Sequence, residues 1–201
     1  MKYIEQENIT NSYKKAYLEN GVSLKALQWG NDYNNIALIY KELIVGIDIN
    51  NSSILDVGCG FGDIIPYIYS YNKFFKYNGV DIVPEFIETA KLRYPNEKFI
   101  YLDYFNKPLK QKFDYIICCG ALNGKSRLLE HKKEIIKLMF NNCYKGIAFN
   151  MTGYYPVIKE SSKRVRYENS LDILTFCLSL SSKISFKQNY LINNFTIQLF
   201  K

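Results

Sequence analysis

Ile54-Leu-Asp-Val-Gly-Cys-Gly-Phe-Gly-Asp63 is the stretch of sequence that determines the fold class of this chain. The apolar run that opens it predicts a buried strand, and Gly58, Gly60 and Gly62 predict a tight turn before a helix. A strand, a glycine turn and a helix N-terminus together present backbone N–H groups to a nucleotide-sized ligand. The spacing is G-x-G-x-G, with Asp56 two residues before the first glycine, so it differs from the G-x-G-x-x-G of dinucleotide-binding proteins. We therefore expect a nucleotide-type ligand that is not a dinucleotide.

Downstream of residue 53, short β-rich runs alternate with segments of helical periodicity. Strands are predicted at 53–58, 76–81, 97–102, 113–119 and 145–150, and helices at 62–70, 84–94 and 129–142. This alternation predicts right-handed crossovers and a parallel sheet with helices on both faces. After a helix at 171–180, strands at 183–189 and 195–200 follow so closely that they pair antiparallel. The predicted fold is α/β: a Rossmann-like, doubly wound, mostly parallel sheet with an antiparallel last strand.

Length and composition bound the domain organisation. The chain has 201 residues, of which 48% are hydrophobic and 22% charged, and this is typical of one globular domain. We expect an N-terminal helical cap over residues 1–50, with turns at Asn20-Gly21 and Gly30-Asn31, and a core over residues 51–201. No apolar run approaches the ~18–20 residues of a membrane span, and the N-terminus lacks the apolar region of a signal peptide. The prediction is one soluble, cytoplasmic domain.

The net charge of +7 raises the question of a nucleic-acid partner. The lysines are scattered along the chain, and the only tight basic cluster is Lys163-Arg164-Val165-Arg166, so a solvated surface is the favoured interpretation. The five cysteines and His131, the only histidine, show no metal-ligand spacing. We expect reduced, mostly buried thiols and no metal site.

Carboxylates end the two predicted strands that follow the glycine turn. Asp81 ends the strand at 76–81, where a carboxylate can accept hydrogen bonds from both hydroxyls of a ribose. Asp103 follows the next strand and can accept from an exocyclic amine. Each feature alone has a plainer explanation, a tight turn or a helix cap. Together, in this order, they favour an adenosine ligand without a pyrophosphate, since carboxylates this dense would repel phosphate.

Three segments resemble successive motifs of the class I S-adenosylmethionine-dependent methyltransferases: Ile54–Asp63, Gly79–Ala90 and Phe113–Ile117. The terminal hairpin, Lys183–Lys201, is similar to that family's last two strands, and the resemblance covers about residues 24–201. It implies a seven-stranded sheet with an antiparallel last strand, and S-adenosylmethionine as the cofactor.

The same resemblance implies a cofactor site. It makes Asp81 the ribose ligand, puts the glycine turn beside the methionine moiety with Asp56 near its amino group, and puts Asp103 and Tyr104 on either side of the adenine. The cofactor-binding residues expected on these motifs are Asp56, Gly58, Cys59, Gly60, Gly62, Asp81, Ile82, Asp103 and Tyr104.

A narrower resemblance concerns a bacterial subgroup of small-molecule methyltransferases, some of which are found with surface-polysaccharide genes. It rests on the segments Gln28-Trp-Gly-Asn31, Gly120-Ala-Leu-Asn123, Asn189-Tyr190 and Asn194-Phe-Thr196. The resemblance implies that Trp29 and Asn31 line the cofactor or acceptor pocket. Packing in the core is the alternative role for Trp29.

Methyl transfer from a sulfonium requires alignment of the nucleophile, exclusion of water and, for a hydroxyl acceptor, removal of a proton. The candidates for orienting the acceptor are Asn123, after the fourth strand, and Tyr154 with Tyr155, after the fifth. His131 is a candidate general base, although its polar helix start is more typical of a surface histidine. Methyltransferases that act on amino groups usually carry an Asn/Asp-Pro-Pro-Tyr-like motif after the fourth strand. Here that place reads Cys118-Cys-Gly-Ala-Leu-Asn123, which argues against an exocyclic amine and favours an oxygen or another small-molecule acceptor.

The sequence therefore predicts transfer of a methyl group to a small molecule, on an oxygen of a sugar or phosphorylated metabolite, with surface-polysaccharide modification as one setting. Lys125, Arg127 and the cluster of Lys163, Arg164 and Arg166 are either contacts for an anionic substrate or, as we favour, part of a solvated face. Two alternatives stay open. An RNA methyltransferase requires a contiguous basic face around the pocket, and a non-catalytic cofactor-binding module requires a blocked acceptor pocket.

Overall fold

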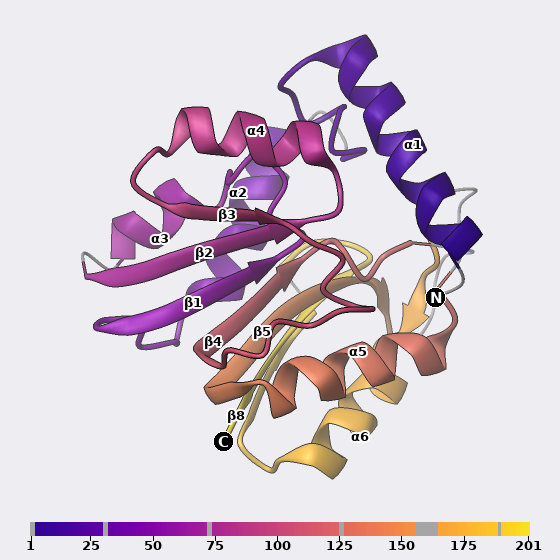
Figure 1. Ribbon diagram of the computed structural model, residues 1–201. Helices are drawn as coiled ribbons and strands as arrows, with labels where there is room; N and C mark the ends of the chain where they lie inside the picture. The colour runs from indigo at the N-terminus through magenta and orange to yellow at the C-terminus, as the bar shows by residue number, and fades with distance from the viewer. Residues whose placement is uncertain (1–2, 30–31, 72–73, 125–126, 156–164, 189) are drawn as a thin grey trace.

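The computed structural model describes residues 3–29, 32–71, 74–124, 127–155, 165–188 and 190–201, with side chains from Glu7 onward. Its centre is an eight-stranded sheet (Figure 1). Seven strands follow the order β3 (Lys98–Tyr101), β2 (Phe75–Asp81), β1 (Ser52–Val57), β4 (Phe113–Cys119), β5 (Cys143–Tyr154), β8 (Asn194–Phe200), β7 (Ile184–Lys187). All pairings are parallel except those of β8 with β5 and with β7. The predicted doubly wound, mostly parallel sheet with an antiparallel last strand is confirmed.

Helices cover both faces of this sheet (Figure 1). One face carries α2 (Tyr33–Ile44), α3 (Ile65–Tyr71) and α4 (Pro84–Arg93), and the other carries α5 (Leu129–Asn141) and α6 (Ser170–Leu180). Strand β1 is buried on both sides, with Ile54 in one core cluster and Leu55 and Val57 in the other. Burial on both faces explains why the sequence of β1 is a continuous apolar run and not an alternating one.

Local signals in the sequence explain where several helices begin. Pro84 occupies the first turn of α4, where a missing N–H costs nothing. The Asp32 side chain caps α2 by accepting hydrogen bonds from the backbone N–H groups of Asn34 (3.0 Å) and Asn35 (3.2 Å). The expected turn at Asn20-Gly21 ends helix α1 (Tyr3–Asn20), whereas the one at Gly30-Asn31 lies outside the described residues. None of the described helices combines the length and apolar character needed to cross a lipid bilayer.

The largest boundary difference is at the end of β5, where the structure also has a short strand that the sequence did not predict. Strand β5 runs to Tyr154 because it pairs with β8 as far as Thr152–Asn194. Its end also pairs with β6 (Glu168–Asn169), a strand of two residues that is too short to leave a periodic pattern in the sequence. The buried Glu168 carboxylate accepts a hydrogen bond from Lys132 Nζ at 2.9 Å, and this ion pair anchors β6 to α5.

Candidate cofactor and acceptor site

The glycine turn leaves β1 at the carboxyl edge of the sheet and is bound to β2. The backbone N–H groups of Gly58 and Cys59 donate to the Val80 carbonyl at 2.8 and 3.1 Å. Gly58 has a φ of +77°, which favours glycine, and a Cβ there would lie 2.6 Å from Ala121 Cβ on the loop after β4. Only glycine fits this position, so the turn forms an open cradle whose shape is set by backbone packing.

Asp81 ends β2 beside this cradle, and backbone groups hold its carboxylate. Oδ2 accepts from the Gly60 N–H and Oδ1 from the Val83 N–H, each at 2.9 Å. Burial raises the pKa of Asp81 to about 6, against the opposing effect of these hydrogen bonds. The carboxylate is ionised at neutral pH and has a fixed orientation.

Asp56 lies beneath the cradle and does not line the cavity described next. It is 2% exposed, and its Oδ2 accepts a hydrogen bond from the Tyr77 hydroxyl at 2.6 Å. No described group hydrogen-bonds to Oδ1. Burial raises the pKa of Asp56 to about 7, although the Tyr77 hydrogen bond lowers it. This carboxyl therefore titrates near neutral pH.

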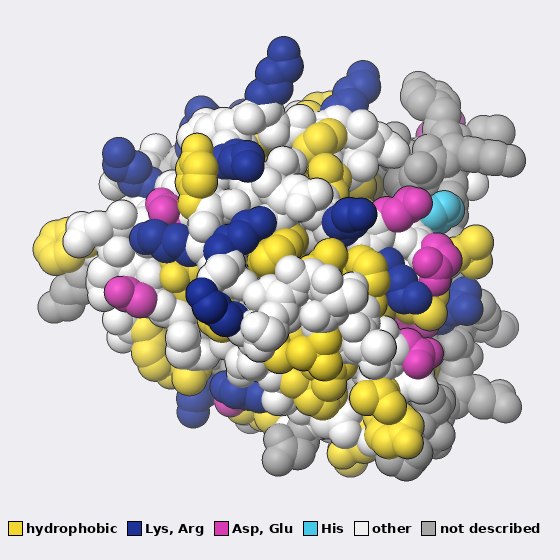
Figure 2. Space-filling view, turned by 90° about the horizontal axis from the view of Figure 1, so that it is seen from below, with side chains coloured by type: hydrophobic (Ala, Val, Ile, Leu, Met, Phe, Trp, Pro, Cys, Tyr) yellow, Lys and Arg dark blue, Asp and Glu magenta, His cyan; other side chains and the backbone are white. Residues whose placement is uncertain are grey.

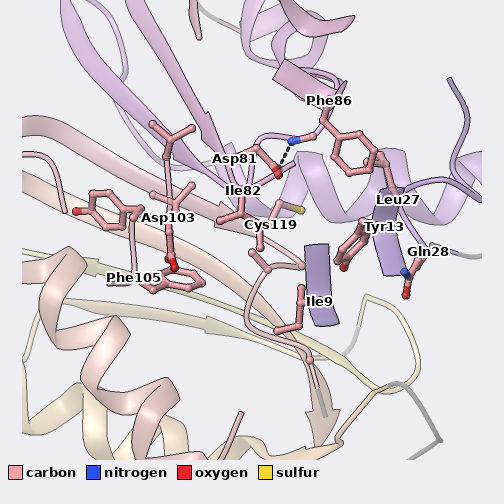
Figure 3. Close-up of a pocket in the computed structure, with 18 of the residues that line it drawn as sticks. Ile9, Tyr13, Leu27, Gln28, Asp81, Ile82, Phe86, Asp103, Phe105 and Cys119 are labelled. Carbon is pink, nitrogen blue, oxygen red and sulfur yellow. Dashed lines mark hydrogen bonds between the residues drawn. The ribbon is translucent and has the colours of Figure 1, made fainter. Parts of the chain in front are cut away.

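A cavity of about 390 Å³ opens at this edge of the sheet (Figure 3). Its walls come from the ends of β1, β2, β3 and β4 and from α1. Of the expected cofactor-binding residues, those that line it are Trp29, Gly58, Gly60, Asp81, Ile82, Asp103 and Tyr104. Asp56, Cys59 and Gly62 do not, because the Cys59 thiol packs against Gly79 and Gly62 faces Tyr94. Trp29 also packs on Gly120, where a Cβ would lie 2.6 Å from its ring, so it is both a wall of the cavity and part of the packed structure.

The three candidate catalytic residues do not line this cavity. Asn123 Oδ1 accepts a hydrogen bond from the Thr152 N–H at 2.8 Å, so its side chain joins the loop after β4 to β5. Tyr154 is the last residue of β5, and Tyr155 beyond it is 49% exposed. His131 is exposed on α5 and borders a separate cavity of about 270 Å³. Asn31, Lys125, Lys163, Arg164 and Asn189 lie outside the described residues.

Helix α1 contributes a wall that the sequence did not predict. Ile9 and Tyr13 face the cavity opposite Asp103 and Phe105 (Figure 3). The helix is held by aromatic packing, since the Tyr13 and Tyr17 rings lie 5.9 and 6.0 Å from that of Phe86. The sequence signal was the spacing of Ile9, Tyr13 and Tyr17 at i, i+4 and i+8, which marks one face of a helix.

Arg127 also lines this cavity, and the expectation that it belongs to a solvated face is wrong. It is 7% exposed, and its guanidinium lies 4.8 Å from the centre of the Phe105 ring. Its Nη1 donates to the Ala121 carbonyl. A cation–π contact and a hydrogen bond therefore hold this buried cation in the cavity wall. Sequence reasoning missed this burial because a single arginine in a loop carries no periodic pattern.

The cofactor side of the cavity combines the glycine cradle with the Asp81 carboxylate. A glycine cradle and a carboxylate at the end of the next strand, both at the carboxyl edge of a parallel sheet, define a nucleoside-type cofactor site of a Rossmann-like protein. The methyltransferase domain family matches residues 48–190, and the chain belongs to it. The expected enzyme class, a methyltransferase that uses S-adenosylmethionine, is confirmed.

Individual relatives agree with this assignment. A methyltransferase of Mycobacterium tuberculosis is 24% identical over 154 residues, which are 72% of this chain and 90% of that protein. Two further relatives are longer, and the chain matches 34% and 60% of their lengths. The crystal structure of DhpI with S-adenosylhomocysteine has the same fold, with a TM-score of 0.70 and 12% identity over 97% of this chain and 95% of DhpI. Magnesium protoporphyrin IX methyltransferase from Synechocystis, also with S-adenosylhomocysteine, has a TM-score of 0.63 and 14% identity over 84% of this chain and 82% of that one.

Proposed function

We propose that this chain transfers the methyl group of S-adenosylmethionine to a small-molecule acceptor that enters the same cavity. The observation that carries the proposal is the shared cavity: it runs from the glycine cradle and Asp81 to residues of α1. When bound, the cofactor supplies a methyl group already activated by a positive sulfur. The chain then has to hold the two reactants in line and keep water out.

The residues of the cavity fit this cofactor. We assign the Asp81 carboxylate to the ribose hydroxyls, because the backbone fixes it and it can accept two further hydrogen bonds. The part of the cavity that Gly58, Gly60 and Trp29 line suits the methionine moiety. The adenine is assigned to the space between Ile82, Asp103 and Tyr104. We leave Asn123, Tyr154 and His131 out of the reacting groups, because none of them lines the cavity.

The acceptor belongs to the finer part of the proposal: an oxygen of a sugar or phosphorylated metabolite. By its name, the structural relative from Synechocystis acts on magnesium protoporphyrin IX, which is a small molecule. An RNA acceptor is disfavoured by charge, because the described cavity lining contains one cation, Arg127, beside Asp81 and Asp103. On the face seen in Figure 2, the Lys and Arg side chains are interspersed with acidic and hydrophobic ones. A non-catalytic module is disfavoured because the cavity extends beyond the residues assigned to the cofactor, as far as α1.

The organisation of the chain is part of the same proposal. We propose a single domain in which residues 1–50 form a cap and residues 51–201 the core, working in the cytoplasm. The packing of Tyr13 and Tyr17 of α1 on Phe86 of α4 supports this division, since the cap is attached to the core next to the cavity.

Calorimetric titration with S-adenosylhomocysteine tests the cofactor half. We expect the wild type to bind and Asp81→Asn to bind about 10- to 100-fold more weakly, because an amide replaces the charged acceptor and its NH₂ faces a backbone donor. Asp172 is an exposed residue of α6, and Asp172→Asn removes the same charge there. This variant is the matched control, and we expect its affinity for S-adenosylhomocysteine to equal that of the wild type. Failure of the wild type to bind, or equal affinity in Asp81→Asn, contradicts the assignment.

A further inference from the structure

A buried cation stands in the wall of the cavity beyond the groups assigned to the cofactor. Arg127 precedes α5. Both Arg127 and Phe105 line the cavity of about 390 Å³ (the main cavity) and the cavity of about 270 Å³ (the second cavity). The guanidinium is held by the Phe105 ring and by the Ala121 carbonyl. A guanidinium fixed in this way matches a carboxylate or phosphate through its planar set of N–H donors, and little conformational entropy remains to be lost on binding.

The other charges of the main cavity locate the place for an anion. Asp81 and Asp103 are the described carboxylates in the lining, and they repel an anionic acceptor. The second cavity contains Glu134 beside His131, so it is also unfavourable for an anion. Arg127 is the described cation of the main cavity, so an anionic acceptor is attracted to the part of the cavity that its guanidinium lines.

Tyr13 of α1 adds a hydrogen-bond donor to this space. Its ring packs edge-on against Phe86 at 5.9 Å, and it lines the main cavity. Burial raises the pKa of Tyr13, the charge of Asp81 raises it further, and Arg127 opposes both effects. The phenol therefore lies within the field of both charges and stays protonated at neutral pH, as a donor to an anion has to be.

We propose that the methyl acceptor carries an anionic group, a carboxylate or a phosphate, and that Arg127 with Tyr13 binds that group and thereby selects the acceptor. This rests on the proposed function, since it names the class of molecule that shares the cavity with the cofactor. Arg127 is a specificity residue in this assignment, and the cofactor site does not depend on it.

The test separates acceptors by charge before they are identified. A small-molecule extract of the source organism is divided on an anion exchanger into retained and unretained fractions, and each is incubated with enzyme and methyl-labelled S-adenosylmethionine. We expect labelled product from the retained fraction. Arg127→Gln should slow this transfer about 10- to 100-fold, the effect of losing a charge-assisted, two-point contact. Tyr13→Phe should slow it by a smaller factor. Lys137→Gln, which removes the same charge at an exposed residue of α5, should leave the transfer rate unchanged.

Binding of S-adenosylhomocysteine, measured for each variant, separates this inference from the proposed function. We expect Arg127→Gln to bind it within about twofold of the wild type, and a folded protein that binds it poorly would assign Arg127 to the cofactor instead. Transfer from the unretained fraction, or equal rates in Arg127→Gln, overturns the inference alone. Transfer from neither fraction by protein that binds S-adenosylhomocysteine contradicts both the inference and the small-molecule acceptor of the proposed function. Pretreatment with alkaline phosphatase, with and without a phosphodiesterase, distinguishes the two sources: transfer lost after either treatment assigns a phosphate, and transfer retained after both assigns a carboxylate.

Discussion

The two halves of the cavity are held in different ways. In the cofactor half, the Asp81 carboxylate is bound by backbone N–H groups, and the glycine turn is fixed to β2 by backbone hydrogen bonds. In the half formed by α1, the attachment is made by side chains: Tyr17 hydrogen-bonds to Thr89 at 3.2 Å, and Lys14 forms an ion pair with Glu85 at 2.8 Å. Backbone geometry tolerates few sequences, whereas side-chain contacts tolerate many. The cofactor half is therefore recognisable from the sequence, whereas the α1 half is not.

Substitution of the cradle glycine should give the largest effect. Gly58→Ala puts a Cβ 2.6 Å from Ala121 Cβ at a φ of +77°, so strain and overpacking together should lower the free energy of unfolding by about 3 kcal/mol. S-adenosylhomocysteine affinity should fall at least about tenfold. Urea denaturation and calorimetry measure the two effects.

Gly21→Ala is the matched control for this substitution. Gly21 also has a positive φ, +60°, but nothing lies within 4 Å of its Cβ position. We expect a loss of only about 1 kcal/mol from backbone strain, and unchanged S-adenosylhomocysteine affinity. Similar results for the two substitutions would show that the cofactor half is not held by close backbone packing.

Next in size is a pH effect beneath the cradle. The pKa of Asp56 is about 7 in the folded chain and 3.8 in the absence of burial, so the folded state binds more protons between these values. Stability is then present below pH 4 and is lost as the pH rises towards 7, at up to about 1.4 kcal/mol per unit. Asp56→Asn does not titrate. Between pH 5 and 8, we expect the wild type to lose about 2 kcal/mol more unfolding free energy than Asp56→Asn in urea denaturation. Parallel curves would mean that Asp56 is ionised throughout.

The alternation of strands and helices and the cofactor edge followed from the sequence, because both depend on local patterns. The glycine turn, Asp81 and Asp103 each lie within a few residues of a strand end, and parallel strands bring those ends together. Arg127 and Tyr13 could not be placed in this way, since their burial depends on how a loop and a helix distant in sequence meet across the sheet. Asn123 shows the reverse case: it follows the fourth strand as expected, but its amide joins the loop after β4 to strand β5 and does not line the cavity.

A smaller effect is expected where α1 attaches to the core. Tyr17→Phe keeps the ring packing on Phe86 and removes the hydrogen bond to Thr89, which should cost about 1 kcal/mol or less. Hydrogen exchange of the α1 amides should become a few-fold faster, while S-adenosylhomocysteine affinity stays near that of the wild type. Tyr33→Phe, at an exposed tyrosine of α2, is the control. Equal acceleration across the glycine turn would show that the two halves of the cavity open together and are not held independently.

The smallest effect should come from the ion pair of α1. Lys14 and Glu85 side chains are 52% and 25% exposed, so solvent and salt screen their attraction, and Lys14→Ala should cost no more than about 0.5 kcal/mol. The hydrogen bond from Lys14 lowers the pKa of Glu85 below 4.5, so whatever stability the pair contributes is present above that pH and lost as the pH falls through the lowered value. The difference between wild type and Lys14→Ala should therefore disappear in acid and in 0.5 M salt. A loss of several kcal/mol that persists in salt would mean that charge, and not aromatic packing, holds α1 over the cavity.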